Sequence, residues 1–136
     1  MRTRNIRLAL AASLRIAIVL LALPINAQAG FIDDYGTWNQ LSIERKRAYI
    51  MGMFDISANT ASDKTSEAMA NGLRQCANKT QLNAQMLIET IDDYYRNHKD
   101  KWSENVAYVF METVISNVCR SYIDAERKKV GLQPLP

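Results

Sequence analysis

The sequence predicts an all-α fold, a small helical bundle of about four helices with one intramolecular disulfide. Apolar residues recur at spacings of three and four over most of residues 42–129, as they do in amphipathic helices. We find no segment with the alternating pattern of a half-buried strand. The two cysteines, Cys76 and Cys119, follow an export-like leader, so we expect them to form a disulfide in an oxidising compartment.

Residues 1–29 have the composition of a secretory signal peptide. They contain four arginines and no acidic residue, and an apolar run over residues 16–23 is followed by Pro24. Ala27 and Ala29 are the small residues that a signal peptidase accepts, which predicts cleavage before Gly30. Eight consecutive apolar residues fall short of the ~20 that span a bilayer, so a membrane anchor is disfavoured. We therefore expect a periplasmic protein with a single helical domain over residues 30–136.

The charge of the predicted mature chain argues against nucleic-acid binding. From residue 30 onward, 13 Lys and Arg residues stand against 14 acids, a net charge of −1. A nucleic-acid-binding protein needs a basic surface that displaces counterions from phosphates. The mature chain would have 107 residues, and a disulfide closing a loop of 44 residues would stabilise such a small domain by about 4 kcal/mol.

The first half of the domain predicts one clear helix and one weak helix. Residues 31–41 have no clear period, so we expect an irregular lead-in that packs its aromatic residues on the body. Ser42 is the expected N-cap of a helix that continues to about Ala61. Arg45-Lys46-Arg47 in its first turns is either a solvated face or a binding patch. Between residues 62 and 75 we expect a brief second helix, weakened by Gly72. The apolar side of the first helix consists of Tyr49, Ile50, Met53, Phe54 and Ser57.

The second half predicts two stronger helices. Thr80 is the expected cap of a helix over residues 81–97, which a polar connection over residues 97–101 joins to a last helix. Ser103 is the expected cap of that helix, residues 104–129, which Gly131 ends. The disulfide would then tie the start of the third helix to the later turns of an antiparallel neighbour. The apolar stripes are Ala84, Leu87, Ile88, Ile91, Tyr94 and Tyr95 in the third helix, and Val106, Ala107, Phe110, Met111, Val114, Val118 and Tyr122 in the last.

The residue types that carry catalysis or bind metals are sparse. His98 is the only histidine and lies in the charged connection, where a surface position is favoured over a catalytic one. Asp33-Asp34 and Asp92-Asp93 are adjacent pairs, which point about 100° apart on a helix and do not converge on one metal. The cysteine spacing is not that of a redox pair or a zinc site. We therefore expect no enzyme, no catalytic residue, no metal and no cofactor.

From Cys76 onward, the chain resembles the periplasmic immunity proteins of the Tai type, the type VI amidase immunity family. The resemblance implies a helical, disulfide-bonded and often dimeric periplasmic protein. Such a protein binds and inhibits a peptidoglycan-degrading amidase toxin of type VI secretion. Family members often carry prolines near Ala77-Asn78-Lys79 and Lys99-Asp100, and their absence here predicts looser turns. The resembling residues are Cys76, Thr80, Gln85, Tyr94, Tyr95, His98, Ala107, Val109 and Cys119, with Trp38 and residues 49–55 upstream.

The connection over residues 97–102 is the segment that we expect to contact a protein partner. Tyr94, Tyr95, His98 and Trp102 are the candidate contacts, because aromatic residues dominate the energetics of interfaces. Burial of the tyrosines and the tryptophan within the monomer is the alternative. Two other functions remain open, a small periplasmic acid-stress chaperone or other envelope binding protein, and a hydrolase.

Overall fold

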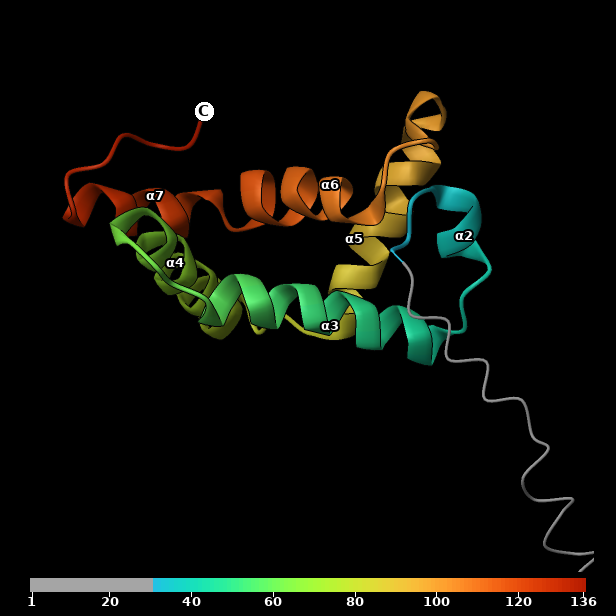
Figure 1. The fold of residues 1–136 in the computed structure, drawn as a ribbon, viewed down its shortest axis with the longest axis horizontal. Coiled ribbons are helices and arrows are strands. Elements are labelled where there is room, and N and C mark those ends of the chain that lie inside the picture. The colour runs from blue at the N-terminus through green and yellow to red at the C-terminus, as the bar shows by residue number, and fades with distance from the viewer. Residues whose placement is uncertain (1–30) are drawn as a thin grey trace, which may run out of the picture. The chain divides into compact units, whose positions relative to one another are not determined.

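The computed structural model describes residues 31–136, and the predicted signal peptide lies outside the described residues. The described chain contains six α-helices and no strand, which confirms the all-α class but exceeds the predicted four helices. None of these helices is both long and apolar enough to cross a membrane. The α-helices are α2 (Tyr35–Asn39), α3 (Ile43–Asn59), α4 (Lys64–Thr80), α5 (Ala84–Asn97), α6 (Val106–Phe110) and α7 (Arg120–Lys129), supplemented by the 3₁₀-helix η1 (Lys99–Lys101) and the π-helix η2 (Met111–Val118). Figure 1 shows their arrangement.

The predicted irregular lead-in contains the short helix α2. Its first turn forms because the Asp34 carboxylate accepts a hydrogen bond of 2.7 Å from the backbone N–H of Thr37. The expected packing is confirmed for two aromatic residues, since Trp38 is fully buried and Tyr35 packs against the core, whereas Phe31 is exposed. The sequence pattern missed the helix because five residues are too few to show a period.

Helix α3 begins as predicted, with the Ser42 side chain accepting a hydrogen bond from the Arg45 N–H. It ends at Asn59, two residues before the expected end at Ala61. Its inner face buries Ile50, Phe54 and Ala58, together with the unexpected Lys46. Of the three consecutive basic residues, Lys46 is therefore neither part of a solvated face nor free to form a binding patch.

Helix α4 corrects the prediction of a brief helix between residues 62 and 75. It has 17 residues and starts with a capping box, in which Asp63 and Ser66 each bond the other's backbone N–H. Gly72 lies in its middle, where a glycine normally weakens a helix. Here the glycine permits close packing, because a Cβ at this position would lie 2.4 Å from the Cα of Ile123 in α7.

The boundary between α4 and α5 also differs from the prediction. Thr80 ends α4, Gln81 adopts a left-handed conformation with φ of 55°, and Asn83 caps α5 by accepting from the Met86 N–H. Cys76 thus lies within α4, not ahead of the third predicted helix. Residues 77–79, where the missing proline predicted a loose turn, also belong to α4 and need their backbone N–H groups for its hydrogen bonds.

The last predicted helix is present, but it is not a continuous α-helix. Asn105, not Ser103, caps it by accepting from the Tyr108 N–H, and the eight residues of η2 have π geometry. The Cys119 N–H bonds the Val114 carbonyl, five residues earlier, at 2.8 Å. Part of the predicted stripe is wrong, because Ala107, Met111 and Val118 are exposed, and the wider turn accounts for the shift of the buried position from Val118 to Cys119. The residues buried in addition to the predicted ones are Val109, Thr113, Ile115, Cys119, Ile123 and Glu126.

The predicted disulfide between Cys76 and Cys119 is present, with a Cα–Cα distance of 5.4 Å. It joins the later part of α4 to the residue that precedes α7, and the two helices pack closely along their length. Both cysteines are fully buried within the hydrophobic core. The covalent bond and the glycine contact therefore fix the same pair of helices.

Candidate functional site

The segment between α5 and α6 is the region for which the sequence predicts partner contacts. It contains η1, whose turn is closed by a hydrogen bond of 2.9 Å from the Lys101 N–H to the His98 carbonyl. A second turn follows, in which the Glu104 N–H bonds the Lys101 carbonyl at 3.0 Å. We call residues 94–104, which comprise the last residues of α5 and the turns after them, the aromatic loop. The loose turn expected at Lys99-Asp100 is instead an ordered 3₁₀ turn.

Tyr95 and Trp102 lock the two sides of the aromatic loop together. The Tyr95 hydroxyl donates to the Glu104 carbonyl at 2.7 Å, and the Trp102 indole N–H donates to the Tyr95 carbonyl at 2.9 Å. Tyr95 is fully buried, and its burial raises the pKa of its hydroxyl. Tyr95 thus offers no surface to a partner. Its contribution is to hold the loop in shape.

Helix α2 supports Trp102 from the other side. The Tyr35 ring lies 5.0 Å from the ring of Tyr95 and 4.9 Å from that of Trp102, measured between centroids. The Tyr35 N–H also donates to the Trp102 carbonyl at 2.9 Å. The Trp102 side chain nevertheless remains 45 % exposed. One face of the indole is therefore fixed and another is available for binding.

Tyr94 and His98 form a second stacked pair on the same loop. Their rings are 4.5 Å apart with an angle of 25°, and His98 Nδ1 lies 2.8 Å from the Tyr94 carbonyl oxygen. Because a carbonyl oxygen only accepts, this contact is a hydrogen bond when Nδ1 carries the proton. In the neutral imidazole, Nε2 is then left with a lone pair on an exposed residue. Partial burial raises the pKa of Tyr94.

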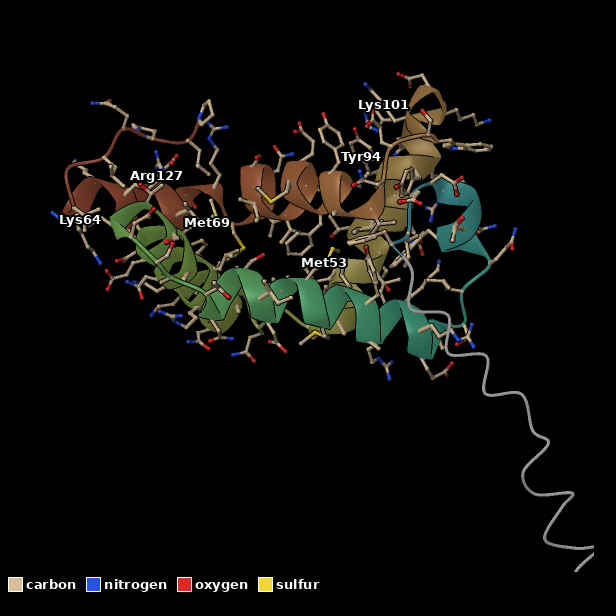
Figure 2. The ribbon with its side chains drawn as sticks, viewed as in Figure 1. Met53, Lys64, Met69, Tyr94, Lys101 and Arg127 are labelled. Atoms are coloured by element: carbon tan, nitrogen blue, oxygen red, sulfur yellow. A yellow bond between two sulfur atoms is a disulfide. The ribbon has the colours of Figure 1, made fainter. Side chains whose placement is uncertain are left out.

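Tyr108 in α6 extends this surface, and the sequence analysis did not identify it as a contact. It is 43 % exposed and lies close enough to Tyr94 to help raise the pKa of that tyrosine. Figure 2 shows Tyr94 and Lys101 near the end of α5. The period of the last predicted helix gave no reason to select Tyr108, since the predicted stripe skips it. The aromatic loop and Tyr108 together present two tyrosines, a histidine and a tryptophan on neighbouring elements.

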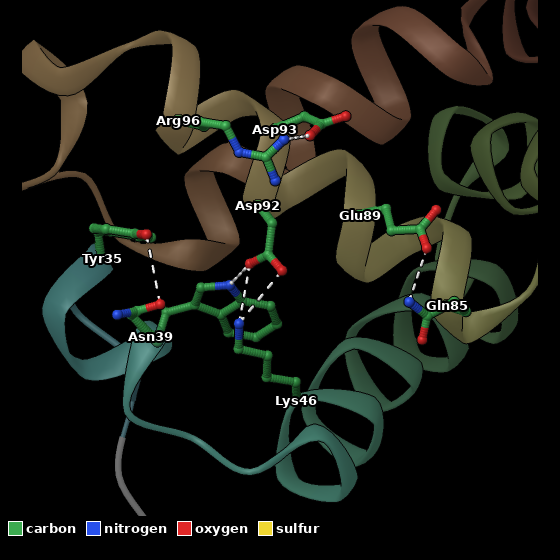
Figure 3. Close-up of polar contacts among 9 residues, drawn as sticks. Tyr35, Asn39, Lys46, Gln85, Glu89, Asp92, Asp93 and Arg96 are labelled. Carbon is green, nitrogen blue, oxygen red and sulfur yellow. Dashed lines mark hydrogen bonds and ion pairs between the residues drawn. The ribbon is translucent and has the colours of Figure 1, made fainter.

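A partly buried ion pair, drawn in Figure 3, holds α5 in place. Asp92 accepts a hydrogen bond of 2.6 Å from the Trp38 indole N–H and pairs with Lys46 at 3.0 Å. The Lys46 ammonium lies 4.8 Å from the centre of the Trp38 ring, within the range of a cation–π interaction. These contacts tie α2, α3 and α5 together. The aromatic loop therefore starts from a helix that is fixed on two sides.

The charged residues around the loop form only local pairs. Arg96 pairs with Asp93 at 2.8 Å and Lys101 with Glu104 at 3.9 Å, each three residues apart. Exposed pairs of this kind contribute little to stability, so these side chains can readjust to a partner. Within residues 31–136, no three His, Cys, Asp or Glu side chains gather as metal ligands. The arrangement is suited to contact with a protein surface.

Comparisons with protein-family models, with curated proteins and with solved structures find no match for this chain.

Proposed function

We propose that this chain is a periplasmic immunity protein, which binds and inhibits a peptidoglycan-degrading amidase through the aromatic loop. The observation that carries the proposal is that Trp102 is both fixed by hydrogen bonds and exposed. Its indole N–H and its backbone carbonyl are both hydrogen-bonded within the protein, and yet nearly half of the side chain is exposed. An exposed tryptophan held in this way is ready for binding.

The physical basis of this proposal is preorganisation. Association costs about 0.5–1.5 kcal/mol for each flexible side chain that becomes fixed at an interface. In the aromatic loop this cost is already met during folding, because the Trp102 ring packs at a tilt against Tyr35 and the His98 ring stacks on Tyr94. Tryptophan and tyrosine are also the residues most enriched among the energetically dominant contacts of interfaces.

Different observations support the proposed compartment and the proposed partner. The leader-like residues 1–29 and the disulfide both favour an oxidising compartment outside the cytoplasm, which we take to be the periplasm. The identity of the partner as an amidase toxin rests on the resemblance to the Tai-type immunity family, which also suggests a homodimer. In this proposal the chain itself performs no catalysis and needs no cofactor.

The test is inhibition of peptidoglycan cleavage by the amidase that the mature protein captures from periplasmic extract. We expect His98→Ala and Trp102→Ala each to weaken inhibition about tenfold or more, since dominant contacts are worth at least about 1–2 kcal/mol. Ile56→Ala is the matched control, because Ile56 is the most exposed helical apolar residue and lies on α3. Circular dichroism verifies that each variant is folded.

The proposal fails in either of two ways. If no captured protein loses its peptidoglycan-cleaving activity, the assignment to amidase inhibition is wrong. If inhibition occurs but both loop variants inhibit as the unaltered protein does, the interface lies elsewhere on the surface.

A further inference from the structure

The residues after α7 turn back along that helix. Gly131 has a φ of 77°, which favours glycine, and the Leu132 N–H donates to the Arg127 carbonyl at 2.9 Å. Residues 132–136, which we call the tail, then run back beside α7, as Figure 1 shows. The tail has no helical or strand hydrogen bonds of its own, so α7 determines its position.

Three side chains on one face of α7 bind the main chain of the tail. Arg127 Nε donates to the Gln133 carbonyl at 2.6 Å, Asp124 Oδ1 accepts from the Leu135 N–H at 2.7 Å, and Arg120 Nη2 donates to the Leu135 carbonyl at 2.5 Å. Spacings of four and three place residues 120, 124 and 127 in one row along a helix. Arg120 and Asp124 also pair with each other at 3.6 Å, which orients both for the tail.

Apart from its main chain, the tail contacts the rest of the protein mainly through one apolar side chain. Leu135 is partly buried and packs against the hydrophobic core, whereas Gln133 is exposed. Pro134 and Pro136 on either side lack an N–H and restrict the chain to extended conformations, which reduces the entropy lost on binding. The row on α7 therefore recognises an extended segment in which an apolar residue stands between prolines.

We propose that this face of α7 is a binding site for an extended, proline-containing segment of another protein, and that the tail occupies it as a competing intramolecular ligand. Each contact is made to a group that any peptide of this form carries, so the site does not require the covalent link to α7. A tail attached through one short turn has an effective concentration of the order of millimolar, so a weak partner is excluded and a stronger one displaces it. This site is separate from the aromatic loop and does not depend on the function proposed above.

The experiment measures binding of a fluorescent synthetic peptide with the sequence of residues 132–136 by anisotropy. The variant Leu135→Asp, made in the whole mature domain, releases the tail, because it would place a charge against the apolar core. We expect Leu135→Asp to bind the peptide at least about tenfold more tightly than the unaltered protein does. Gln133→Asp is the matched control: it adds the same charge to the tail at an exposed position, so it should bind as weakly as the unaltered protein.

A second arm tests the main-chain contacts directly. A peptide methylated at the nitrogen that corresponds to Leu135 cannot donate to Asp124, so it should bind the Leu135→Asp variant several-fold more weakly. If Leu135→Asp is folded by circular dichroism and does not bind the unmodified peptide, α7 holds only its own tail and the proposal is wrong. It is equally wrong if light scattering finds a dimer that Leu135→Asp dissociates, since the occupant would then be the tail of a second copy.

Discussion

Gly72 shows how a single residue sets the distance between two helices. A Cβ at this position would meet the backbone and side chain of Ile123 at 2.4–2.8 Å, and a backbone atom cannot move aside as a flexible side chain can. Glycine normally weakens a helix, and the sequence around Gly72 therefore predicts only a brief helix. The contact with α7 that compensates for this cost cannot be predicted from the local sequence, because Ile123 lies far along the chain.

We predict that Gly72→Ala destabilises the protein, although alanine is the better helix former. Overpacking against a backbone typically costs about 1–3 kcal/mol, which outweighs the gain of up to about 1 kcal/mol in helix propensity. The free energy of unfolding from urea titration, followed by circular dichroism, measures the difference. Gly52→Ala in α3 is the matched control, since a Cβ at residue 52 would have no atom within 4 Å and should stabilise the helix by about 0.5–1 kcal/mol. Equal effects at the two glycines would contradict the packing argument.

The helix caps show how far local sequence determines a boundary. The prediction of Ser42 is confirmed: serine is a favoured N-cap residue, and the helix begins at the next residue, Ile43. Thr80 and Ser103 were wrong, and in both cases an asparagine two or three residues later is the actual cap. All of these residue types are good caps, so the sequence offers several starts and the packing of the whole helix selects one.

The partly buried ion pair between Lys46 and Asp92 lies beyond what sequence patterns can predict. Asp92 contacts Lys46 and Trp38, which are 46 and 54 residues away in the sequence. A basic residue within a basic run is usually exposed, and only the position of α5 shows why Lys46 is not. Among the predicted contact residues, the same reasoning separates Tyr95, which is fully buried, from Trp102 and His98, which are exposed.

At the scale of elements, η2 explains why part of the last helical stripe was wrong. Residues five apart lie about 140° apart around an α-helix but nearly above one another in a π-helix. Val114 and Cys119 are joined by such a five-residue hydrogen bond, and both are fully buried. The Asn117 side chain also donates to the Glu112 carbonyl, five residues earlier, at 2.7 Å. The π segment thus turns Cys119 toward Cys76, which a constant period of 3.6 residues cannot predict.

We predict that insertion of one alanine after Ser116 prevents the disulfide from forming, whereas deletion of Ser116 leaves it intact. Deletion makes Val114 and Cys119 four residues apart, and an ordinary α turn then places them on the same face as the π turn does. Insertion makes them six residues apart, so that neither helical period brings Cys119 to α4. Mass spectrometry after alkylation would then detect two free thiols in the insertion variant. Insertion of one alanine after Ala61, an exposed residue in the link between α3 and α4, lengthens the chain equally and should leave the disulfide intact. Free thiols after deletion of Ser116 would contradict this account of how the π segment orients Cys119.

For the whole molecule, the sequence predicted the class and the covalent bond but not which helices the bond joins. The prediction placed Cys76 ahead of the third helix, whereas it lies in α4 and the disulfide joins α4 to the start of α7. The apolar pattern of α4 is diluted by small residues, since its buried positions include Ala68, Ala70 and Gly72. Small residues let two backbones approach closely, so the close packing of α4 against α7 leaves few large apolar residues in the sequence of α4.

The pH dependence of folding separates the immunity function from the acid-stress chaperone. Asp34 and Asp63 cap α2 and α4, and hydrogen bonds from the Thr37 and Ser66 backbone N–H groups hold the pKa of each carboxyl below its ordinary value of 3.8. The unfolded chain therefore binds more protons in this range, so the caps stabilise the fold fully above pH 3.8 and lose that effect as the pH falls through the lower folded-state pKa values. A chaperone that opens in acid instead needs titratable groups whose protonation destabilises the folded state between about pH 4 and 6.

We predict that the helical signal in circular dichroism is constant from neutral pH down to about pH 4 and that acid destabilisation begins only below it. Asp63→Asn is the sharpest variant, because asparagine is an equally good cap but does not titrate. Its free energy of unfolding should match that of the unaltered protein at neutral pH and fall less steeply below pH 3.8. The isosteric Asp93→Asn, at an exposed site in the middle of α5, controls for the loss of one acid. Loss of helicity between about pH 4 and 6 in the unaltered protein would contradict the capping argument and favour the chaperone, since an acid-opened chain could still be held together by the disulfide.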